Sequence, residues 1–447
     1  MPRSELRRTI RLSIVEGLFY QVYASLAAPG SAFLTKFAVL LQATPLHFGI
    51  LSAIGQLAQV FQVLGVAISR RMTSRKKATL WTSGLGRALA LGYGFLFFLL
   101  PRQAAIWAFL ALLSLSASLQ AVSGNLWVAW IADMVPLPIR GRFFARRSQY
   151  LLVAGLLSGY LLGALVDLFD PQPGAIAQAL RAVLPPWPFL SGDNLPYALL
   201  AVFGLGAVVG LWGLPILARQ PERPKAVEQE RLGKMLLEPL RDGNFRRLLL
   251  YAFWWMMAVG VGAPFWGPFM IKNLGMPLVY IMLYGTLSTL ASLFALGPWG
   301  RLIDRFGNKT AMRLALVLGG LNPILWVFAT PQHYEIIYLE AISSGVMWSG
   351  ANLVAVNLVL AIAPEGRQQA YSGVFNAFSG LFIVLPMLLS GLLFPPPLPI
   401  LGLHLQPEQV LFGLGGLLRW SAQIPLTWVY EPRARPVREV LRHLLRR

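Results

Sequence analysis

The residues that most often carry out chemistry in proteins are sparse in this sequence and do not cluster. The four histidines, His47, His333, His404 and His443, are scattered, and none has a second histidine at the spacing of a metal site. The chain has no cysteine, which excludes a disulfide framework and a cysteine metal site. Phosphate-binding loops, zinc-protease helices and nucleophile-elbow motifs are all missing. We therefore expect no cofactor and no metal, and the sequence does not favour ATP-driven transport.

Carboxylates within or at the ends of long apolar stretches are candidates for a site, because a buried acid is costly unless it is paired or functional. Such residues are Glu16, Asp133, Asp167, Glu335 and Glu340. Glu16, which has Tyr20 and Gln21 nearby, is our first candidate for binding a proton or a cation, and Glu340 is the second. A position in the lipid headgroup region is the alternative interpretation of both.

Amide and aromatic side chains in the same stretches are candidates for binding a solute. Asn125 and Asn352 follow small residues, and an amide there needs a partner from another helix, water or a substrate. Tryptophan rings suit sugar rings or amphipathic organic molecules. The tryptophans concerned are Trp127, Trp130, Trp254, Trp255, Trp266 and Trp348. Helix packing is the alternative for the asparagines, and anchoring at the membrane surface is the alternative for several tryptophans.

The elements that position these residues must be membrane helices. Apolar residues make up 56% of the 447-residue chain and charged residues only 13%, whereas soluble domains are about one quarter charged. This excludes a water-soluble enzyme, a disordered protein and a nucleic-acid-binding domain as interpretations of the whole chain. A span needs about 20 apolar residues. The sequence predicts twelve spans, at residues 13–37, 47–68, 79–100, 104–131, 148–169, 196–218, 247–271, 278–299, 312–330, 335–362, 370–393 and 409–430.

The net charge of +20 indicates membrane orientation rather than a nucleic-acid partner. Most lysines and arginines fall before the first span, in every second connection and in the tail, and such residues collect on the cytoplasmic side. We therefore expect a multi-pass protein of the inner (cytoplasmic) membrane with both termini inside. The basic tail, residues 431–447, is expected to lie on the inner leaflet as an amphipathic helix, with a disordered tail as the alternative.

A charged segment at residues 219–246 divides the spans into two sets of six, residues 1–218 and 247–430. The two sets share short patterns in the same order. Ala28-Pro29 corresponds to Ala263-Pro264, and Asn125 corresponds to Asn352. The predicted fold is therefore an all-α membrane protein of two pseudo-symmetric six-helix bundles, joined by a cytoplasmic linker, with a site where the halves meet.

Two loops make the sequence resemble the major facilitator superfamily. Residues 300–309 read Gly-Arg-Leu-Ile-Asp-Arg-Phe-Gly-Asn-Lys and fit the family loop G-x-L-x-D-R-x-G-x-R/K at every defined position. The corresponding first-half loop, residues 65–74, is degenerate but keeps its first glycine and Arg70. Residues 133–141 resemble the D/E-x-x-P-x-x-x-R-G pattern that ends the fourth helix in many members.

The resemblance implies alternating access and assigns roles to these loops and helices. The residues expected to gate the cytoplasmic side are Asp304, Arg305, Gly300, Gly307, Lys309, Asp133, Arg140 and Arg70, with an ordinary solvated loop as the alternative. Helices 1, 4, 7 and 10 line the cavity in the family, so the candidate proton or substrate residues are Glu16, Tyr20, Gln21, Asn125, Trp127, Trp254, Trp255, Glu340, Trp348 and Asn352. Arg87 and Arg419 fall on scaffold helices, where snorkelling or a structural ion pair is expected.

These observations predict a monomeric secondary transporter that moves a small organic solute, sugar-like or amphipathic, and is coupled to protons. An uncoupled facilitator or a lipid translocator of the same fold is the alternative. A membrane enzyme acting on lipid-linked substrates is remote because the spans contain no acidic cluster. A non-transporting sensor is remote because only a short central linker is left for a signalling domain.

Overall fold

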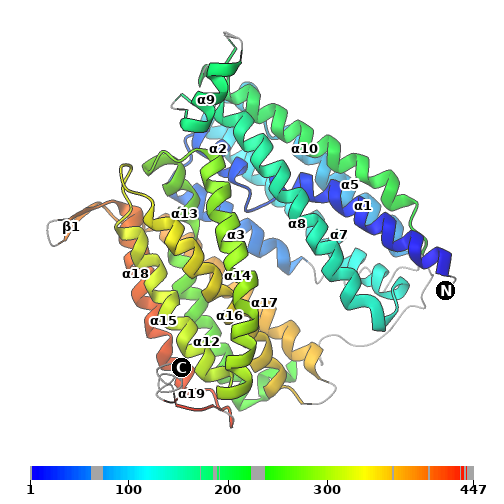
Figure 1. Ribbon diagram of the computed structural model, residues 1–447, viewed down its shortest axis with the longest axis vertical. Coiled ribbons are helices and arrows are strands. Elements are labelled where there is room, and N and C mark those ends of the chain that lie inside the picture. The colour runs from blue at the N-terminus through cyan, green and yellow to red at the C-terminus, as the bar shows by residue number, and fades with distance from the viewer. Residues whose placement is uncertain are drawn as a thin grey trace. The chain divides into compact units, whose positions relative to one another are not determined.

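The computed structural model of this chain is helical almost throughout (Figure 1). It describes residues 3–61, 74–171, 173–184, 189–190, 192–222, 237–364, 367–400, 403–432, 434–436 and 439. The principal helices are α1 (Arg3–Ala27), α2 (Ala32–Leu40), α3 (Pro45–Val60), α5 (Arg75–Leu89), α6 (Leu96–Leu99), α7 (Arg102–Met134), α8 (Leu137–Asp167), α9 (Ala175–Val183), α10 (Leu195–Ala218), α12 (Gly243–Gly262), α13 (Trp266–Pro268), α14 (Leu278–Phe306), α15 (Asn308–Val327), α16 (Ile336–Ile362), α17 (Gln368–Leu392), α18 (Pro407–Ser421) and α19 (Gln423–Trp428).

Eight helical segments in the described part of the chain are long and apolar enough to cross a membrane. They fall in α7, α8, α10, α12 with its extension to Asn273, α14, α15, α16 and α17. Each overlaps one of the spans expected from the sequence. The chain is therefore a multi-pass membrane protein, and the full count of twelve spans stays a prediction.

The other four expected spans coincide with helices that are interrupted, short or only partly described. The first is split between α1 and α2 because Gly30 turns the chain with a positive φ of 92° and Ser31 then caps α2. The second contains α3, beyond which residues 62–73, Arg70 included, lie outside the described ranges. The third is divided between α5 and α6, and the last between α18 and α19.

One local expectation from the sequence was wrong. The charged stretch between the fourth and fifth spans was expected to be a loop, but α8 begins at Leu137, because prolines fit the first turn of a helix. The arginines that follow are therefore helical. Outside the helices, β1 (Leu398–Ile400) and β2 (Leu403–Leu405) form an antiparallel hairpin in which Leu398 pairs with Leu405. The proline run before β1 prevents a helix there.

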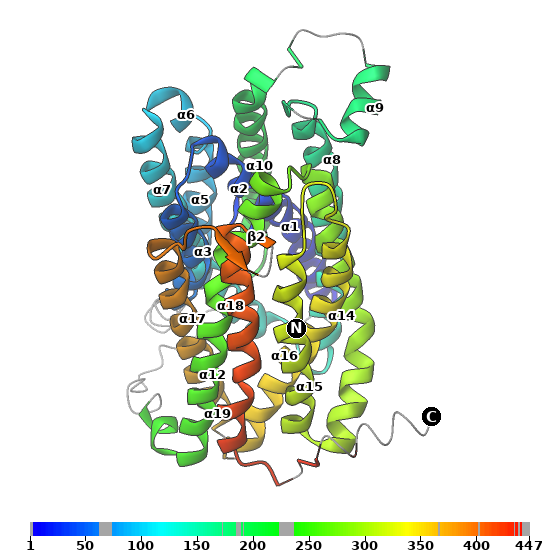
Figure 2. The same ribbon diagram turned by 90° about the vertical axis from the view of Figure 1, so that its left-hand side faces the viewer.

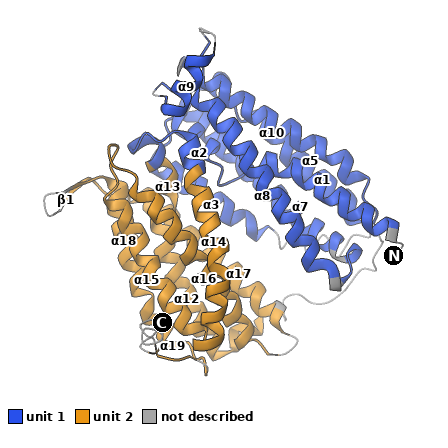
Figure 3. Ribbon diagram, viewed as in Figure 1, with its two compact units in different colours: residues 1–229, 270–282 blue, residues 230–269, 283–447 orange. Residues whose placement is uncertain are grey.

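The chain divides into two compact units (Figure 3). The first holds residues 1–229 and 270–282, and the second holds residues 230–269 and 283–447. The start of α14 belongs to the first unit. There the carboxylate of Asp167, at the end of α8, accepts hydrogen bonds from the backbone N–H groups of Leu278 (2.8 Å) and Val279 (3.0 Å).

The same helix pairings occur in both units. In the first, α1 packs on α10 and α8, α5 packs on α7, and α10 packs on α5. In the second, α12 packs on α18 and α17, α15 packs on α16, and α18 packs on α15. Figure 2 shows α12, α17 and α18 side by side in the second unit. Helices at corresponding places in the two halves of the sequence therefore pack against corresponding partners.

A glutamate caps an equivalent helix in each unit. Glu222 accepts hydrogen bonds from the Ser74 hydroxyl (2.8 Å) and the Lys76 backbone N–H (2.9 Å) at the start of α5. Glu431 accepts from the backbone N–H groups of Asn308 (2.9 Å) and Lys309 (2.6 Å) at the start of α15. Carboxylates favour helix N-termini because the unpaired N–H groups there carry partial positive charge.

Candidate functional site

The first unit encloses a polar cavity of about 320 Å³ among α1, α5, α7, α8 and α10. Its lining consists of Glu16, Tyr20, Thr79, Ser83, Arg87, Gln120, Ser123, Gly124, Trp127, Val128, Arg147 and Leu217. We call this the N-terminal cavity. It brings together three of the residues expected from the sequence, Glu16, Tyr20 and Trp127, with polar groups that the sequence analysis did not single out.

A buried ion pair forms one wall of the N-terminal cavity. The guanidinium of Arg87 donates from Nη2 to Glu16 Oε1 (2.6 Å) and from Nη1 to the Gly210 carbonyl oxygen (2.6 Å), and both charged side chains are almost fully buried. Arg87 Cζ lies 5.2 Å from the centre of the Tyr20 ring. A Cβ at Gly213 would come within 3.2 Å of the Arg87 guanidinium, so glycine leaves room for it. Arg87 therefore forms a buried ion pair, which was one of the two expectations for it, and it also lines the cavity.

A second arginine, Arg147, enters the cavity from α8. Its Nε donates to the Ser13 carbonyl oxygen (3.3 Å), and its Cζ lies 4.3 Å from the centre of the Trp127 ring. A Cβ at Gly17 would lie 2.8 Å from an Arg147 guanidinium nitrogen, so this glycine permits the close approach to α1. The sequence analysis missed Arg147 because it assigned the residue to a loop. Continuing the helix back to Pro136 would have placed it inside the bundle.

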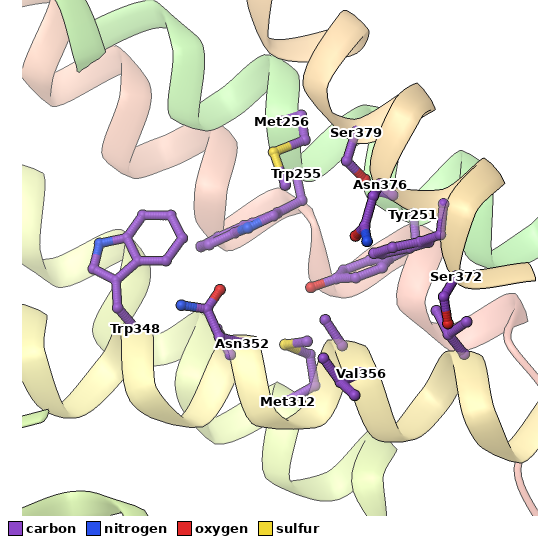
Figure 4. Close-up of a pocket in the computed structure, with 15 residues that line it drawn as sticks. Tyr251, Trp255, Met256, Met312, Trp348, Asn352, Val356, Ser372, Asn376 and Ser379 are labelled. Carbon is purple, nitrogen blue, oxygen red and sulfur yellow. The ribbon is translucent and has the colours of Figure 1, made fainter. Parts of the chain in front are cut away.

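The second unit contains a more aromatic cavity of about 350 Å³, built by α12, α15, α16 and α17. We call this the C-terminal cavity. The Trp255 and Trp348 rings lie 5.9 Å apart. Figure 4 shows the Asn352 and Asn376 amides and the Tyr251 hydroxyl directed into the same space. Trp255, Trp348 and Asn352 were expected from the sequence, whereas Asn376 was missed although it is an asparagine in an apolar span.

Glu340 is buried near, but not in, the lining of the C-terminal cavity. It accepts a hydrogen bond from the Tyr284 hydroxyl (2.8 Å), and no arginine or lysine lies within ion-pair distance of it among the described residues. Arg419 is also buried in this unit, where Nη1 donates to the Gly319 carbonyl oxygen (3.3 Å). The carboxylate of Glu340 is thus held by a neutral partner, unlike that of Glu16.

Three residues expected in a cavity line neither the N-terminal nor the C-terminal cavity. Trp254 is exposed and donates from Nε1 to the Ser421 hydroxyl (2.9 Å). Gln21 donates from Nε2 to the Ser25 hydroxyl (3.3 Å). Asn125 is half-buried on α7 and lines neither cavity.

Most of the expected gate residues that the structure describes lie at helix ends. Gly307 caps α15 with a positive φ of 87°, and Lys309 donates to the carbonyl oxygens of Thr427 (2.7 Å) and Val429 (2.8 Å).

Asp304 is exposed, and no hydrogen bond or ion pair joins it to another residue that the structure describes. Arg305 Cζ lies 5.4 Å from the Phe306 ring centre. Gly300 lies within α14, where a Cβ would meet open space.

In the first half, the expected gate acid has a partner. Asp133 forms an ion pair with Arg75, which joins the end of α7 to the start of α5. Arg140 donates from Nε (3.3 Å) and Nη2 (3.2 Å) to the Val135 carbonyl oxygen. Asp133 is thus tied to the first turn of α5.

This arrangement suits binding and movement of a solute rather than bond chemistry. Each unit holds a cavity lined by both polar and apolar side chains, and no group of three or more potential metal ligands occurs in the described ranges. Clefts of this size take small organic molecules. The fold and its cavities define a multi-pass membrane transporter.

The chain belongs to the Major Facilitator Superfamily, whose family model matches residues 18–387. No curated protein matches the sequence. The family and the structural neighbours described below point to a transporter and not to an enzyme.

Solved transporter structures share the fold along nearly the whole chain. The nucleoside transporter NupG is 12% identical with a TM-score of 0.66, over 95% of this chain and 100% of that one. The inward-open xylose transporter XylE from E. coli is 14% identical with a TM-score of 0.65, over 98% and 99%. A bacterial homolog of the human lysosomal transporter Spinster, inward-facing and occupied, is 14% identical with a TM-score of 0.62, over 96% and 95%. At these identities the likeness concerns the fold alone.

Proposed function

We propose that this protein is a secondary active transporter that moves a small organic solute by alternating access and couples the movement to protons. The observation that carries the proposal is a solute-sized cavity with mixed polar and apolar lining in each unit, at about 320 Å³ and 350 Å³. Fold neighbours that carry a nucleoside or xylose support an organic cargo, which fits the sugar-like or amphipathic solute expected from the sequence.

The C-terminal cavity supports a ring-shaped or amphipathic portion of the solute. Two tryptophan rings supply flat apolar surface, and the Asn352 and Asn376 amides can donate and accept hydrogen bonds. The Tyr251 and Ser379 hydroxyls are buried there without hydrogen-bond partners in the described structure. A solute with hydroxyl or carbonyl groups would satisfy them.

Proton coupling is proposed through a buried carboxylate, and Glu340 now stands beside Glu16 as a candidate. Glu16 must leave the guanidinium of Arg87 before it can take up a proton, whereas Glu340 accepts a hydrogen bond from the neutral Tyr284 hydroxyl and lies near the Arg419 charge without forming an ion pair with it in the described structure. Release of Glu16 from its pair during the transport cycle would let it bind a proton, and protonation of Glu340 would require no ion pair to break.

The binding claim is tested with the purified full-length protein. Thermal stabilisation is screened against sugars, nucleosides, amphipathic cations, peptides, organic anions and lipids. A hit is then tested for counterflow in proteoliposomes. Saturable counterflow supports a transporter, and its absence for every stabilising compound contradicts the proposed transport.

The coupling claim is tested with Glu16→Gln and Glu340→Gln under an imposed pH gradient. The variant at the coupling site is expected to lose gradient-driven accumulation but to keep counterflow, because exchange needs no net proton movement. Glu335→Gln, an exposed acid close to Glu340, is the matched control. Accumulation by the parent protein that does not respond to the gradient would favour an uncoupled facilitator. Counterflow of a short-chain lipid would favour a lipid translocator.

A further inference from the structure

We propose that the N-terminal cavity is an anion subsite, so that the solute carries a carboxylate, phosphate or similar acidic group. This deepens the proposed transport function and rests on it. The group would bind at Arg147, between Trp127 and the ion pair of Glu16 and Arg87.

The charges that line the cavity do not cancel. Glu16 and Arg87 neutralise each other at 2.6 Å. No carboxylate in the described part of the chain lies within ion-pair distance of Arg147, which contacts one carbonyl oxygen and the Trp127 ring. One guanidinium donates five N–H groups, so most of those of Arg147 are left for a ligand. Arg147 is half-buried, and the nearby Glu16 carboxylate is already paired with Arg87, so the cavity lining keeps one net positive charge that a bound anion would balance.

The hydrogen-bonding groups around the cavity point to the same chemistry. Arg87 Nε, Trp127 Nε1 and Ser83 Oγ are buried, and each lacks a hydrogen-bond partner within the described structure. The first two are donors only, and the third can donate. Buried donors are almost always satisfied in native proteins. An acidic group supplies several acceptor oxygens, and its bonds to charged donors are among the strongest.

A neutral or cationic group fits this cavity less well. A neutral solute would leave the charge of Arg147 uncompensated, and a cation would be repelled by a lining that holds two arginines and one carboxylate. The tryptophan face is already covered by Arg147, at 4.3 Å, and does not offer a free cation–π site on that side.

The test measures binding of matched probes to the purified full-length protein by calorimetry. Benzoate and phenyl phosphate carry the acidic group, benzamide is the neutral counterpart of benzoate, and benzylamine is the cationic one. Dihexanoyl phosphatidate presents the same phosphate on a lipid. We expect the anions to bind and the neutral and cationic probes to bind at least about tenfold more weakly, because charged hydrogen bonds contribute most.

Variants locate the subsite. Arg147→Gln is expected to weaken anion binding about 10- to 100-fold. Arg146→Gln, the exposed neighbour whose guanidinium faces Tyr150, is the matched control and should leave binding unchanged. Trp127→Phe removes the unpartnered donor and keeps an aromatic ring, so it should weaken anion binding about threefold to tenfold without lowering thermal stability. This second variant keeps the test decisive if Arg147→Gln does not fold.

Each outcome bears on the proposal. Equal binding of benzoate, benzamide and benzylamine, or equal loss in the Arg146 and Arg147 variants, overturns the anion subsite. Binding of phosphatidate alone, lost in Arg147→Gln, supports the subsite and identifies a lipid phosphate as the source. Failure of the transport function is a separate result, because it would appear as anion binding that depends on Arg147 but is never followed by counterflow.

Discussion

At the scale of single residues, the most consequential feature is the ion pair of Glu16 and Arg87. Removing one member of a buried pair leaves a charge without compensation, whereas removing both leaves neutral groups in their place. Gly210 contributes a carbonyl oxygen to Arg87, so the pair also joins α1 and α5 to α10. The pair is therefore expected to support the first unit as well as to line its cavity.

Arg87→Gln is expected to destabilise the protein by about 3–5 kcal/mol, and Glu16→Gln combined with Arg87→Gln to recover a large part of that loss. Thermal unfolding of the detergent-purified variants measures both effects. Arg102→Gln, an exposed arginine at the start of α7, is the control and should be neutral. If the double variant is no more stable than Arg87→Gln, the two charges do not compensate each other.

The residues of the cavities were only partly predictable from the sequence. Glu16 and Asn352 could be found because a polar group in an apolar stretch stands out against its neighbours. Arg147 was missed because it follows a charged run that also fits a loop, and it is found only if the helix is extended back to its first prolines. The pairing of Glu16 with Arg87 joins positions far apart in the chain, and no local pattern encodes such a contact.

At the scale of elements, helix ends carry the polar contacts. Asp167 ends α8 and caps the start of α14, where the first backbone N–H groups of a helix have no acceptor within the helix itself. Removing the Asp167 carboxylate should therefore make the first turn of α14 more flexible.

Asp167→Ala is expected to speed hydrogen exchange at the amides of Leu278 and Val279 and to cost about 0.5–2 kcal/mol of stability. Asp170→Ala is the matched control, because that carboxylate pairs with Lys36 and does not cap α14. Hydrogen exchange followed by mass spectrometry measures the exchange rate at the start of α14 in both variants. Exchange at the start of α14 that is the same in both variants would contradict the capping role.

The junction of α14 and α15 carries the proposed cytoplasmic gate. Asp304 is exposed in the last turn of α14 without a partner in the described structure, so it is free to engage one in another conformation. Asp304→Asn should therefore change the rate of substrate counterflow with little effect on expression. Arg301→Gln, an exposed charge in the same turn region, serves for comparison. Counterflow kinetics identical to those of the parent would remove Asp304 from the gate.

At the scale of the whole molecule, the all-helical fold and the family were predictable. The thickness and apolarity of the bilayer set the length and composition of each span, so the spans can be recognised in the sequence. The interruptions of α1 to α2 and α5 to α6 were not, since they depend on turns such as that at Gly30 rather than on hydrophobicity. The hairpin of β1 and β2 lies in a connection with too few residues for a periodic pattern.

The orientation in the membrane can be tested by labelling introduced cysteines, because the chain has no cysteine of its own that would react. A cysteine at Arg241, just before α12, should react with an impermeant maleimide only from the cytoplasmic side. A cysteine at Gln178 on α9 should react only from the outside. Labelling of intact and permeabilised cells compares the two. Reaction of the Arg241 position in intact cells would reverse the proposed topology.

Alternating access is the central claim, and distances between spin labels at the two ends of the molecule test it most directly. Cysteines replacing Lys77 and Arg241 report on the proposed cytoplasmic side, and cysteines replacing Gln178 and Gln332 report on the proposed outer side; all four positions are exposed. Each pair joins one unit to the other. We predict two distance populations for each pair, which a bound solute or a change of pH shifts in opposite directions at the two ends. Distances that stay single and fixed, or that grow and shrink together, would contradict the account.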